Sequence, residues 1–120
     1  RFMFMAGIND EAEFEKFRKT IDWSGFAGKI KAPFLIAAGE SDELCPLEHT
    51  DAFTKALGGP KQLMVYQDSR HSLGGAAVAN GPDPRVYQAE WIGRRLAGKP
   101  MTSERWYIEN SGRVQKTPLA

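Results

Sequence analysis

A short, unbroken apolar run constrains the fold of this chain more than any other feature of its sequence. Residues 34–38 read Phe-Leu-Ile-Ala-Ala, and they stand between Pro33 and Gly39. An apolar stretch of this length between Pro and Gly is typical of a strand buried on both faces, as in a parallel sheet. No apolar run in the chain exceeds five residues, far short of the roughly 20 residues that a membrane-spanning helix needs. The sequence therefore predicts a buried parallel strand and no transmembrane segment.

Extended and helical patterns alternate along the rest of the chain. Capping residues, apolar periodicity and glycine or proline stop signals predict three helices, over residues 11–20, 46–57 and 84–97. Strand composition marks residues 62–67 and a hairpin made by residues 105–109 and 113–116. Residues 1–8 are apolar but too short to classify, residues 24–28 resemble a single turn, and residues 68–83 are expected to form a loop. The order of strand, helix, strand and helix indicates an α/β protein with a parallel sheet.

The apolar residues of the helices predict which faces point inward. The second helix is expected to bury Phe53, Ala56 and Leu57. The third has an apolar stripe at helical spacing, formed by Val86, Ala89, Ile92, Gly93 and Leu96. Arg94 and Arg95 are expected on the solvated face of that helix. The remaining large aromatic residues are interpreted as core or edge-covering side chains: Trp23, Phe26, Trp91, Trp106 and Tyr107.

Charge and cysteine content narrow the function classes. Sixteen Lys and Arg against fifteen Asp and Glu give a net charge of +1, which argues against a nucleic-acid or anionic-membrane binder. One cysteine excludes an intramolecular disulfide and a zinc site built from several cysteines. With no signal-peptide pattern at the start, we expect a reducing compartment, the cytoplasm. Two parallel strands also need neighbours, so we expect the chain to be part of a larger α/β protein.

Two polar loops follow the first two predicted strands. Asp42 lies in the loop after the first strand and His71 in the loop after the second. Parallel strands end at one edge of the sheet, where open α/β sheets bind their ligands. A carboxylate that accepts the histidine Nδ1–H would orient the ring and leave Nε2 free as a general base. The spacing therefore predicts an acid–base pair made by Asp42 and His71.

Other residues offer alternatives to this pair. Asp42 and His71 could be plain loop residues, and Glu40 or Glu43 could supply the acid instead of Asp42. Asp68 is interpreted as a turn residue at the end of the strand.

His49 and Cys45 are the other candidates for chemistry. His49 is expected to be solvated in the first turn of a helix. A metal site that combines it with His71 lacks further ligands. Cys45 is interpreted as a small apolar residue, with a reactive thiol as the alternative.

The segment that contains Asp42 is similar to a known motif. Residues 33–46, PFLIAAGESDELCP, resemble the acid loop of α/β-hydrolases, which carry a Gly-x-x-Asp-x-x-x-Pro pattern after a late strand. In that family the catalytic histidine follows the next and last core strand, which matches the position of His71. The resemblance covers roughly residues 30–96 and implies that Asp42 is the triad acid and His71 the triad base. It looks closest to the esterase and dienelactone-hydrolase-like branch, with the dihydroxypseudooxynicotine-hydrolase-like group as the nearest subgroup.

The sequence departs from this family at the nucleophile. No Gly-x-Ser-x-Gly elbow is present, and the upstream oxyanion-hole segment is also missing. The resemblance therefore implies the C-terminal part of an α/β-hydrolase fold. It divides the chain into a cap-like or lid-like helical segment (1–29), the core half (30–98) and a C-terminal hairpin and tail (99–120).

Two functions are compatible with this division. The first is a serine-type hydrolase that transfers an acyl group from an ester or related carbonyl substrate to water, with carbon–carbon bond hydrolysis as the variant that the subgroup implies. It needs no cofactor or metal, and it would associate with the missing N-terminal half or with a second copy. The alternative is a non-catalytic module that assembles with another chain through its exposed sheet edge and hairpin.

Overall fold

The chain folds around one mixed four-stranded sheet. The computed structural model describes residues 1–22 and 24–120, so Trp23, predicted above as a core or edge aromatic, lies outside the described residues. The strands are β1 (Phe34–Gly39), β2 (Lys61–Tyr66), β3 (Glu104–Ile108) and β4 (Val114–Pro118), in the order β1-β2-β3-β4. Strands β1, β2 and β3 are parallel, and β3 pairs with β4 as an antiparallel hairpin. The α/β class, the parallel pair and the hairpin are confirmed.

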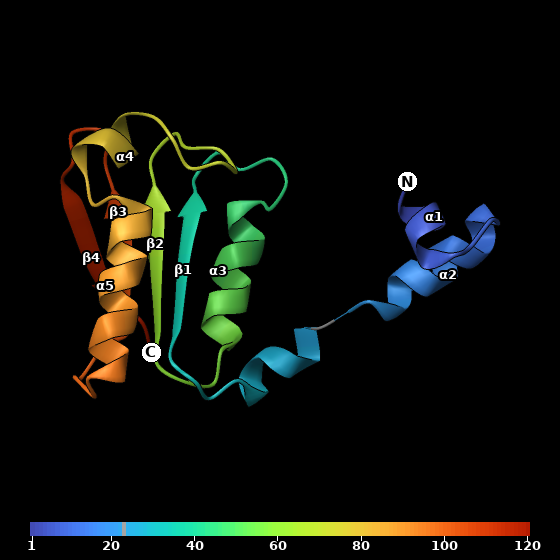
Figure 1. The fold of residues 1–120 in the computed structure, drawn as a ribbon, viewed down its shortest axis with the longest axis horizontal. Coiled ribbons are helices and arrows are strands. Elements are labelled where there is room, and N and C mark those ends of the chain that lie inside the picture. Colours follow the sequence, from blue (N-terminus) through green and yellow to red (C-terminus); the bar gives the residue numbers. More distant parts are fainter. Residues whose placement is uncertain (23) are drawn as a thin grey trace.

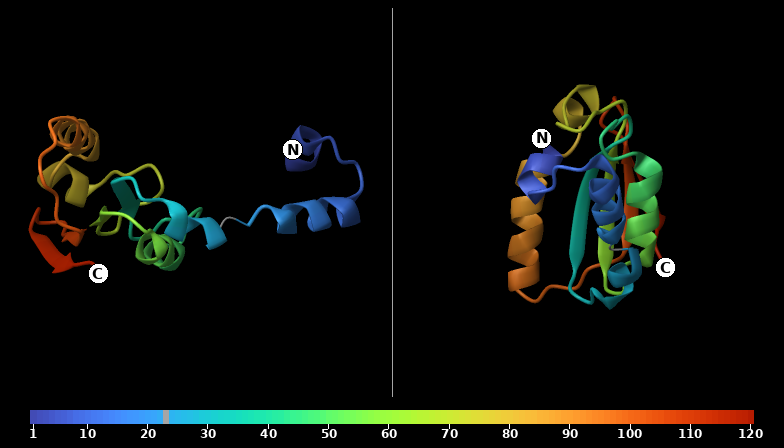
Figure 2. Two further views of the ribbon diagram at one scale, coloured as in Figure 1. Left: turned by 90° about the horizontal axis from the view of Figure 1, so that it is seen from below. Right: turned by 90° about the vertical axis from the view of Figure 1, so that its right-hand side faces the viewer.

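Helices cover both faces of this sheet. α3 (Leu47–Ala56) lies on one face and α5 (Pro84–Leu96) on the other (Figures 1 and 2). Both were predicted, and Pro46 and Pro84 stand at their starts as expected. The 3₁₀ helix at Ser24–Lys29 confirms the predicted turn and contacts α3. The loop predicted over residues 68–83 is wrong in one part, because a short helix, α4 (Ala76–Asn80), forms inside it.

Strand β2 is the centre of the sheet. All six of its residues are buried, and it pairs with β1 on one side and β3 on the other. The hairpin strand β3 therefore gives β2 the second neighbour that two parallel strands alone would lack. The strand before His71 is thus not the last strand of the sheet, contrary to what the resemblance implied. β1 has no second neighbour among the described residues and is only partly buried, so the predicted burial of this strand on both faces is wrong.

The core is split between the two faces of the sheet. On the α5 side, Met64, Tyr66, Ala77 and Ile108 are fully buried together. The α3 side contains a smaller cluster of Ala38, Leu63 and Val65. Alternate residues of β2 thus point to opposite layers, as the period of two in a strand requires.

The inward face of α3 differs from the prediction. Leu57 is buried as expected, whereas Phe53 is 38% exposed and Ala56 is exposed. Thr50 and Thr54 are buried instead, and the Thr54 hydroxyl donates to the Thr50 carbonyl at 2.7 Å. A threonine can lie on the sheet at little cost when its hydroxyl is satisfied within its own helix.

The inward face of α5 was also predicted incorrectly. Ile92 and Leu96 of the apolar stripe are 53% and 84% exposed, while Trp91 is only 8% exposed. Arg94 and Arg95, expected in solvent, are partly buried, and each guanidinium carbon lies 5.3 Å from an aromatic ring centroid of the same helix. Aromatic rings with stacked guanidinium groups therefore cover the sheet, because they bury more surface than the aliphatic stripe.

The N-terminal helices stand apart from the sheet. α1 (Phe2–Ala6) forms in the unclassified segment, and α2 (Glu11–Thr20) is the predicted helix, capped by Asp10. Neither helix contains a buried residue, and both project away from the strands (Figure 1). The radius of gyration is accordingly 17.0 Å, against about 14 Å for a compact chain of this length. No helix in the described ranges has the length and apolar character to cross a membrane.

Candidate active site

Asp42 and His71 lie in contact at one edge of the sheet. The Nδ1 atom of His71 is 2.9 Å from Oδ2 of Asp42. Asp42 follows β1 and His71 follows β2, so both loops leave from the carboxyl ends of neighbouring parallel strands. The predicted juxtaposition of these two side chains is confirmed, while their catalytic role stays a prediction.

Backbone contacts between the two loops bring the pair together. The Ser41 amide donates to the Ser69 carbonyl at 2.9 Å, and the Glu40 amide donates to the Tyr66 carbonyl at 3.0 Å. Gly39 makes this approach possible, because a Cβ at its position would overlap the carbonyl groups of Ser69 and Arg70. A side chain at residue 39 would therefore separate the acid loop from the histidine loop.

The carboxylate of Asp42 is held firmly in place. Its Oδ1 accepts hydrogen bonds from the backbone amides of Leu44 at 2.9 Å and Cys45 at 3.0 Å. The amide of Cys45, together with the His71 hydrogen bond and the Leu44 amide, lowers the pKa of Asp42 below its ordinary value of 3.8, against the opposing effect of desolvation. The acid is therefore ionised at neutral pH.

The ionised acid determines the tautomer of His71. An ionised carboxylate only accepts hydrogen bonds, so His71 Nδ1 carries the proton and donates to Asp42. In a neutral ring this leaves the lone pair on Nε2. The Asp42 side chain is 8% exposed and the His71 side chain 60% exposed, so the acid is sheltered behind a base that solvent can reach. This is the arrangement that a general base requires.

The alternative acids have other roles in the structure. Glu40 accepts from the Asp68 amide at 3.0 Å and from the Tyr107 hydroxyl at 2.9 Å, so it joins the histidine loop to β3. Glu43 forms an exposed ion pair with Arg70 at 3.3 Å. Asp68 lies in a turn at the end of β2 with a φ of 55°, as its interpretation as a turn residue requires. None of these three carboxylates makes a hydrogen bond to His71 in the described parts of the chain.

Two cavities open beside His71. One has a volume of about 170 Å³ and is lined by His71, Asp42, Cys45 and Thr50, together with the last residues of β1. The other has a volume of about 280 Å³ and lies between the histidine loop and the start of α5. Its lining combines three apolar side chains with four polar ones: Leu73, Val78 and Pro84, and His71, Ser72, Arg85 and Gln88. A base that is accessible from both cavities can meet a substrate from either side.

No nucleophile is hydrogen-bonded to His71 in the part of the chain that the structure describes. Within residues 1–22 and 24–120, the hydrogen bond to Asp42 is the only one that the His71 side chain makes. Cys45 is exposed, which contradicts its interpretation as an apolar filler, and its Sγ lies 3.4 Å from the Thr50 hydroxyl rather than on His71. His49 is exposed, as predicted, and its Nε2 lies 3.9 Å from Oε1 of Glu48. No group of three or more His, Cys, Asp or Glu side chains in the described residues is arranged to hold a metal ion.

Sequence reasoning missed the residues that support the histidine loop from β3. The Tyr107 hydroxyl binds Glu40, and the Asn110 side chain donates to Asp68 at 2.9 Å. Burial, followed by the hydrogen bond to Glu40, raises the pKa of Tyr107 to about 12, so its hydroxyl stays a donor. No local pattern signals these contacts, because they join residues 42 and 67 positions apart.

Comparison with protein-family models, with curated proteins and with solved structures finds no match to this chain.

Proposed function

We propose that this chain carries the acid and the base of a serine-type α/β-hydrolase. The observation that carries the proposal is the 2.9 Å hydrogen bond between His71 and Asp42 at the carboxyl ends of adjacent parallel strands. Two backbone amides hold the acid, which gives the pair the fixed orientation that triad chemistry needs. The acid-loop pattern from Gly39 to Pro46 supports the same assignment.

The proposed reaction is acyl transfer from an ester or related carbonyl compound to water. His71 Nε2 removes the proton of a serine hydroxyl as that oxygen attacks the carbonyl carbon, and the imidazolium then gives the proton to the leaving group. Asp42 stabilises the imidazolium and keeps the ring in the productive tautomer. The second half of the cycle repeats these steps with water as the nucleophile. In this proposal the attacking serine lies outside the 120 residues, because none of their serines has the Gly-x-Ser-x-Gly frame. The single cysteine supports a reducing compartment such as the cytoplasm.

The coding sequence upstream of Arg1 gives the first test. A Gly-x-Ser-x-Gly motif after a strand pattern is the expected result, and a start codon directly before Arg1 would refute the proposal.

Ester hydrolysis by the intact protein gives the second test, with the two histidines as test and control. His71→Ala and Asp42→Asn are each expected to lower kcat for p-nitrophenyl esters by about 10⁴-fold. His49→Ala removes the other, solvated histidine and is expected to leave the rate within about twofold. Equal rates for wild type and His71→Ala would remove His71 from the reaction.

A second candidate function rests on the surfaces that the fold leaves uncovered. The outer edge of β1 is unpaired in the described residues, and the α5 stripe of Ile92 and Leu96 faces solvent. Both features suit a module that assembles with another chain, since an open strand edge is a template for pairing. Sedimentation of this chain tests self-association: a dimer that Ile92→Lys dissociates supports it, and a monomer at every concentration refutes it.

A further inference from the structure

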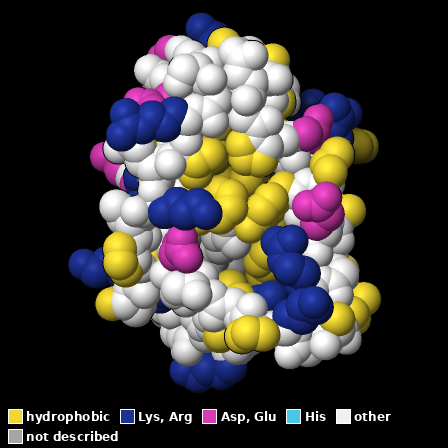
Figure 3. Space-filling view, turned by 90° about the vertical axis from the view of Figure 1, so that its left-hand side faces the viewer, with side chains coloured by type: hydrophobic (Ala, Val, Ile, Leu, Met, Phe, Trp, Pro, Cys, Tyr) yellow, Lys and Arg dark blue, Asp and Glu magenta, His cyan; other side chains and the backbone are white. Residues whose placement is uncertain are grey.

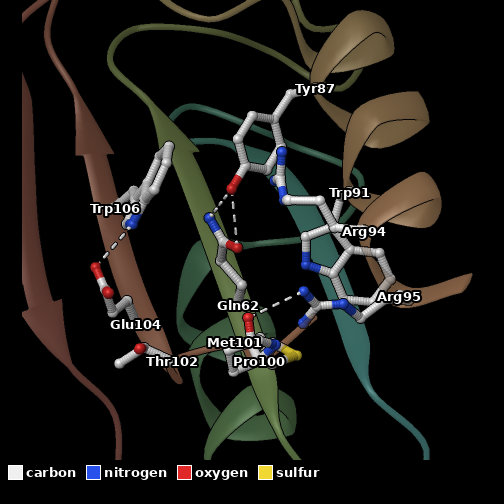
Figure 4. A pocket seen from close by; sticks show the side chains of 10 residues that line it. All are labelled: Gln62, Tyr87, Trp91, Arg94, Arg95, Pro100, Met101, Thr102, Glu104 and Trp106. Carbon is white, nitrogen blue, oxygen red and sulfur yellow. Dashed lines mark hydrogen bonds between the residues drawn. The ribbon is translucent and has the colours of Figure 1, made fainter. Parts of the chain in front are cut away.

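A second concave site lies at the opposite end of the sheet from His71. It is a cavity of about 170 Å³ between α5 and the starts of β2 and β3, here called the α5 cavity. Its lining residues are Gln62, Tyr87, Trp91, Arg94, Arg95, Pro100, Met101, Thr102, Glu104 and Trp106 (Figure 4). Gln62 lies four residues before the end of β2, or about 13 Å along the strand, so this cavity is separate from the acid–base pair.

Most polar groups of the α5 cavity satisfy one another. The Gln62 side chain and the Tyr87 hydroxyl exchange two hydrogen bonds, at 2.8 and 3.1 Å. The Trp106 indole nitrogen donates to Glu104 at 3.1 Å, and Arg95 Nη2 donates to the Pro100 carbonyl at 3.3 Å (Figure 4). These bonds hold the side chains of the cavity wall in place, and they occupy the hydrogen-bond acceptors of Gln62, Glu104 and Pro100.

Three donors on the α5 wall have no acceptor. Trp91 Nε1, Arg95 Nε and Arg95 Nη1 are buried and make no hydrogen bond within the described residues. Trp91 is 8% exposed, and Figure 4 shows its indole nitrogen turned toward the space between α5 and Gln62. Such groups lose their hydration without a compensating hydrogen bond, which is unfavourable for a neutral donor and more so for a charged one. All three unpaired groups are donors, so a ligand that binds here must supply hydrogen-bond acceptors.

The charge of the cavity favours an anion. Arg94 and Arg95 contribute two positive charges to the lining and Glu104 one negative charge. Lys116 adds a further cation at the rim, with its Nζ 4.3 Å from the centre of the Trp106 ring. Figure 3 shows hydrophobic side chains gathered at the centre of this side of the molecule, with Lys and Arg side chains and some Asp or Glu side chains around them.

The aromatic and apolar side chains that line the α5 cavity favour a ligand that also has an apolar ring. Tyr87 and Trp106 meet edge to face with centroids 5.1 Å apart, and Met101 completes an apolar wall. A cavity of about 150 Å³ is large enough for a benzene ring. Arg95 Nη2 donates to the Pro100 carbonyl at 3.3 Å, which leaves its Nε and Nη1 groups to donate to an anion that enters.

We propose that the α5 cavity binds a small aromatic carboxylate, whose ring packs against the aromatic wall and whose oxygens accept from Trp91 Nε1 and Arg95. The site does not depend on the proposed hydrolase activity. It adds a binding function on the sheet face that α5 covers.

The indole N–H signals of the chain in a ¹H–¹⁵N correlation spectrum test the proposal directly. Sodium benzoate is expected to shift the Trp91 signal in a saturable way, and Trp91→Phe assigns that signal by removing it. Benzyl alcohol, which has the ring but no charge, is expected to cause no saturable shift. No shift with benzoate, or equal binding of benzyl alcohol or inorganic phosphate, would overturn the assignment to an aromatic carboxylate.

Variants separate a specific site from general attraction to a basic surface. Arg95→Gln is expected to weaken benzoate binding at least about tenfold, because it removes a charge-assisted donor. Arg113→Gln removes the same charge from the exposed hairpin and is expected to leave the affinity within about twofold. If Arg95→Gln does not fold, Arg95→Lys keeps the charge and side-chain stem and is still expected to weaken binding. Unchanged affinity in a folded Arg95 variant would refute the proposal.

Discussion

Gly39→Ala is the substitution that most directly links the fold to the candidate active site. The added methyl group would lie 2.7 Å from the carbonyl carbon of Ser69 and overlap the carbonyl oxygens of Ser69 and Arg70. These atoms belong to the backbone of the histidine loop, so no side-chain rotation relieves the overlap. Relief requires the two loops to move apart, which also lengthens the contact between Asp42 and His71.

The size of the effect follows from the overlap. Inserting one methyl group into a closely packed site costs about 1–3 kcal/mol. Unfolding entropy is about 2.1 cal/mol/K per residue, or about 0.25 kcal/mol/K for 120 residues, so Tm should fall by about 4–12 °C. Thermal unfolding followed by circular dichroism measures this shift.

Gly93→Ala is the matched control. Gly93 lies within α5, and a Cβ there meets no atom within 4 Å. Alanine is a better helix former than glycine by about 0.5–1 kcal/mol, so Tm should rise by about 2–4 °C. The same chemical change is thus expected to have opposite signs at the two positions. A Gly39→Ala protein as stable as the wild type, with the His71 Nδ1–H signal unchanged, would refute the reasoning.

The remaining predictions concern burial and pH. The pKa of Asp42 is lowered in the folded protein, so its ionised form contributes stability that is present above about pH 3.8 and is lost as pH falls further. Asp42→Asn should therefore show a smaller decrease in Tm between pH 5 and pH 3 than the wild type. Equal decreases in the two proteins would contradict this. Lys61→Met leaves the carbonyls of Lys55 and Leu57 without their buried donor and should cost about 1–3 kcal/mol in a urea titration. Trp91→Ala should lower the free energy of unfolding by about 3–5 kcal/mol, because Trp91 is buried. Ile92→Lys should change that free energy for the monomer by less than about 0.5 kcal/mol, because Ile92 is exposed. The reverse order would mean that α5 packs through its aliphatic stripe.

Local chemistry made the main elements predictable. The apolar run before Gly39 marked β1, and proline or capping aspartate marked the helix starts at residues 11, 47 and 84. The pairing of Asp42 with His71 followed from these elements, because residues after adjacent parallel strands reach the same edge of a sheet.

Helix orientation was not predictable in the same way. Periodicity in α5 indicates a stripe at Ile92 and Leu96, yet Trp91 packs inward one residue away. A hydrophobic stripe shows which residues share a face, but the side that is buried depends on the surfaces offered by the sheet. Aromatic and guanidinium groups also carry large apolar area that a simple apolar pattern does not count.

Local sequence patterns were enough to predict the α/β class, the four strands, the helices α2, α3 and α5, and the placement of an acid and a base on neighbouring loops. The tertiary structure was needed to show that β3 and β4 extend the sheet beyond β2, that Glu40 binds the Asp68 amide rather than His71, and that Arg95 lines a cavity. The physical reason is the range of the interactions. Hydrogen bonding and capping within an element depend on residues a few positions apart, whereas these features depend on contacts between distant segments, whose partners no local pattern specifies.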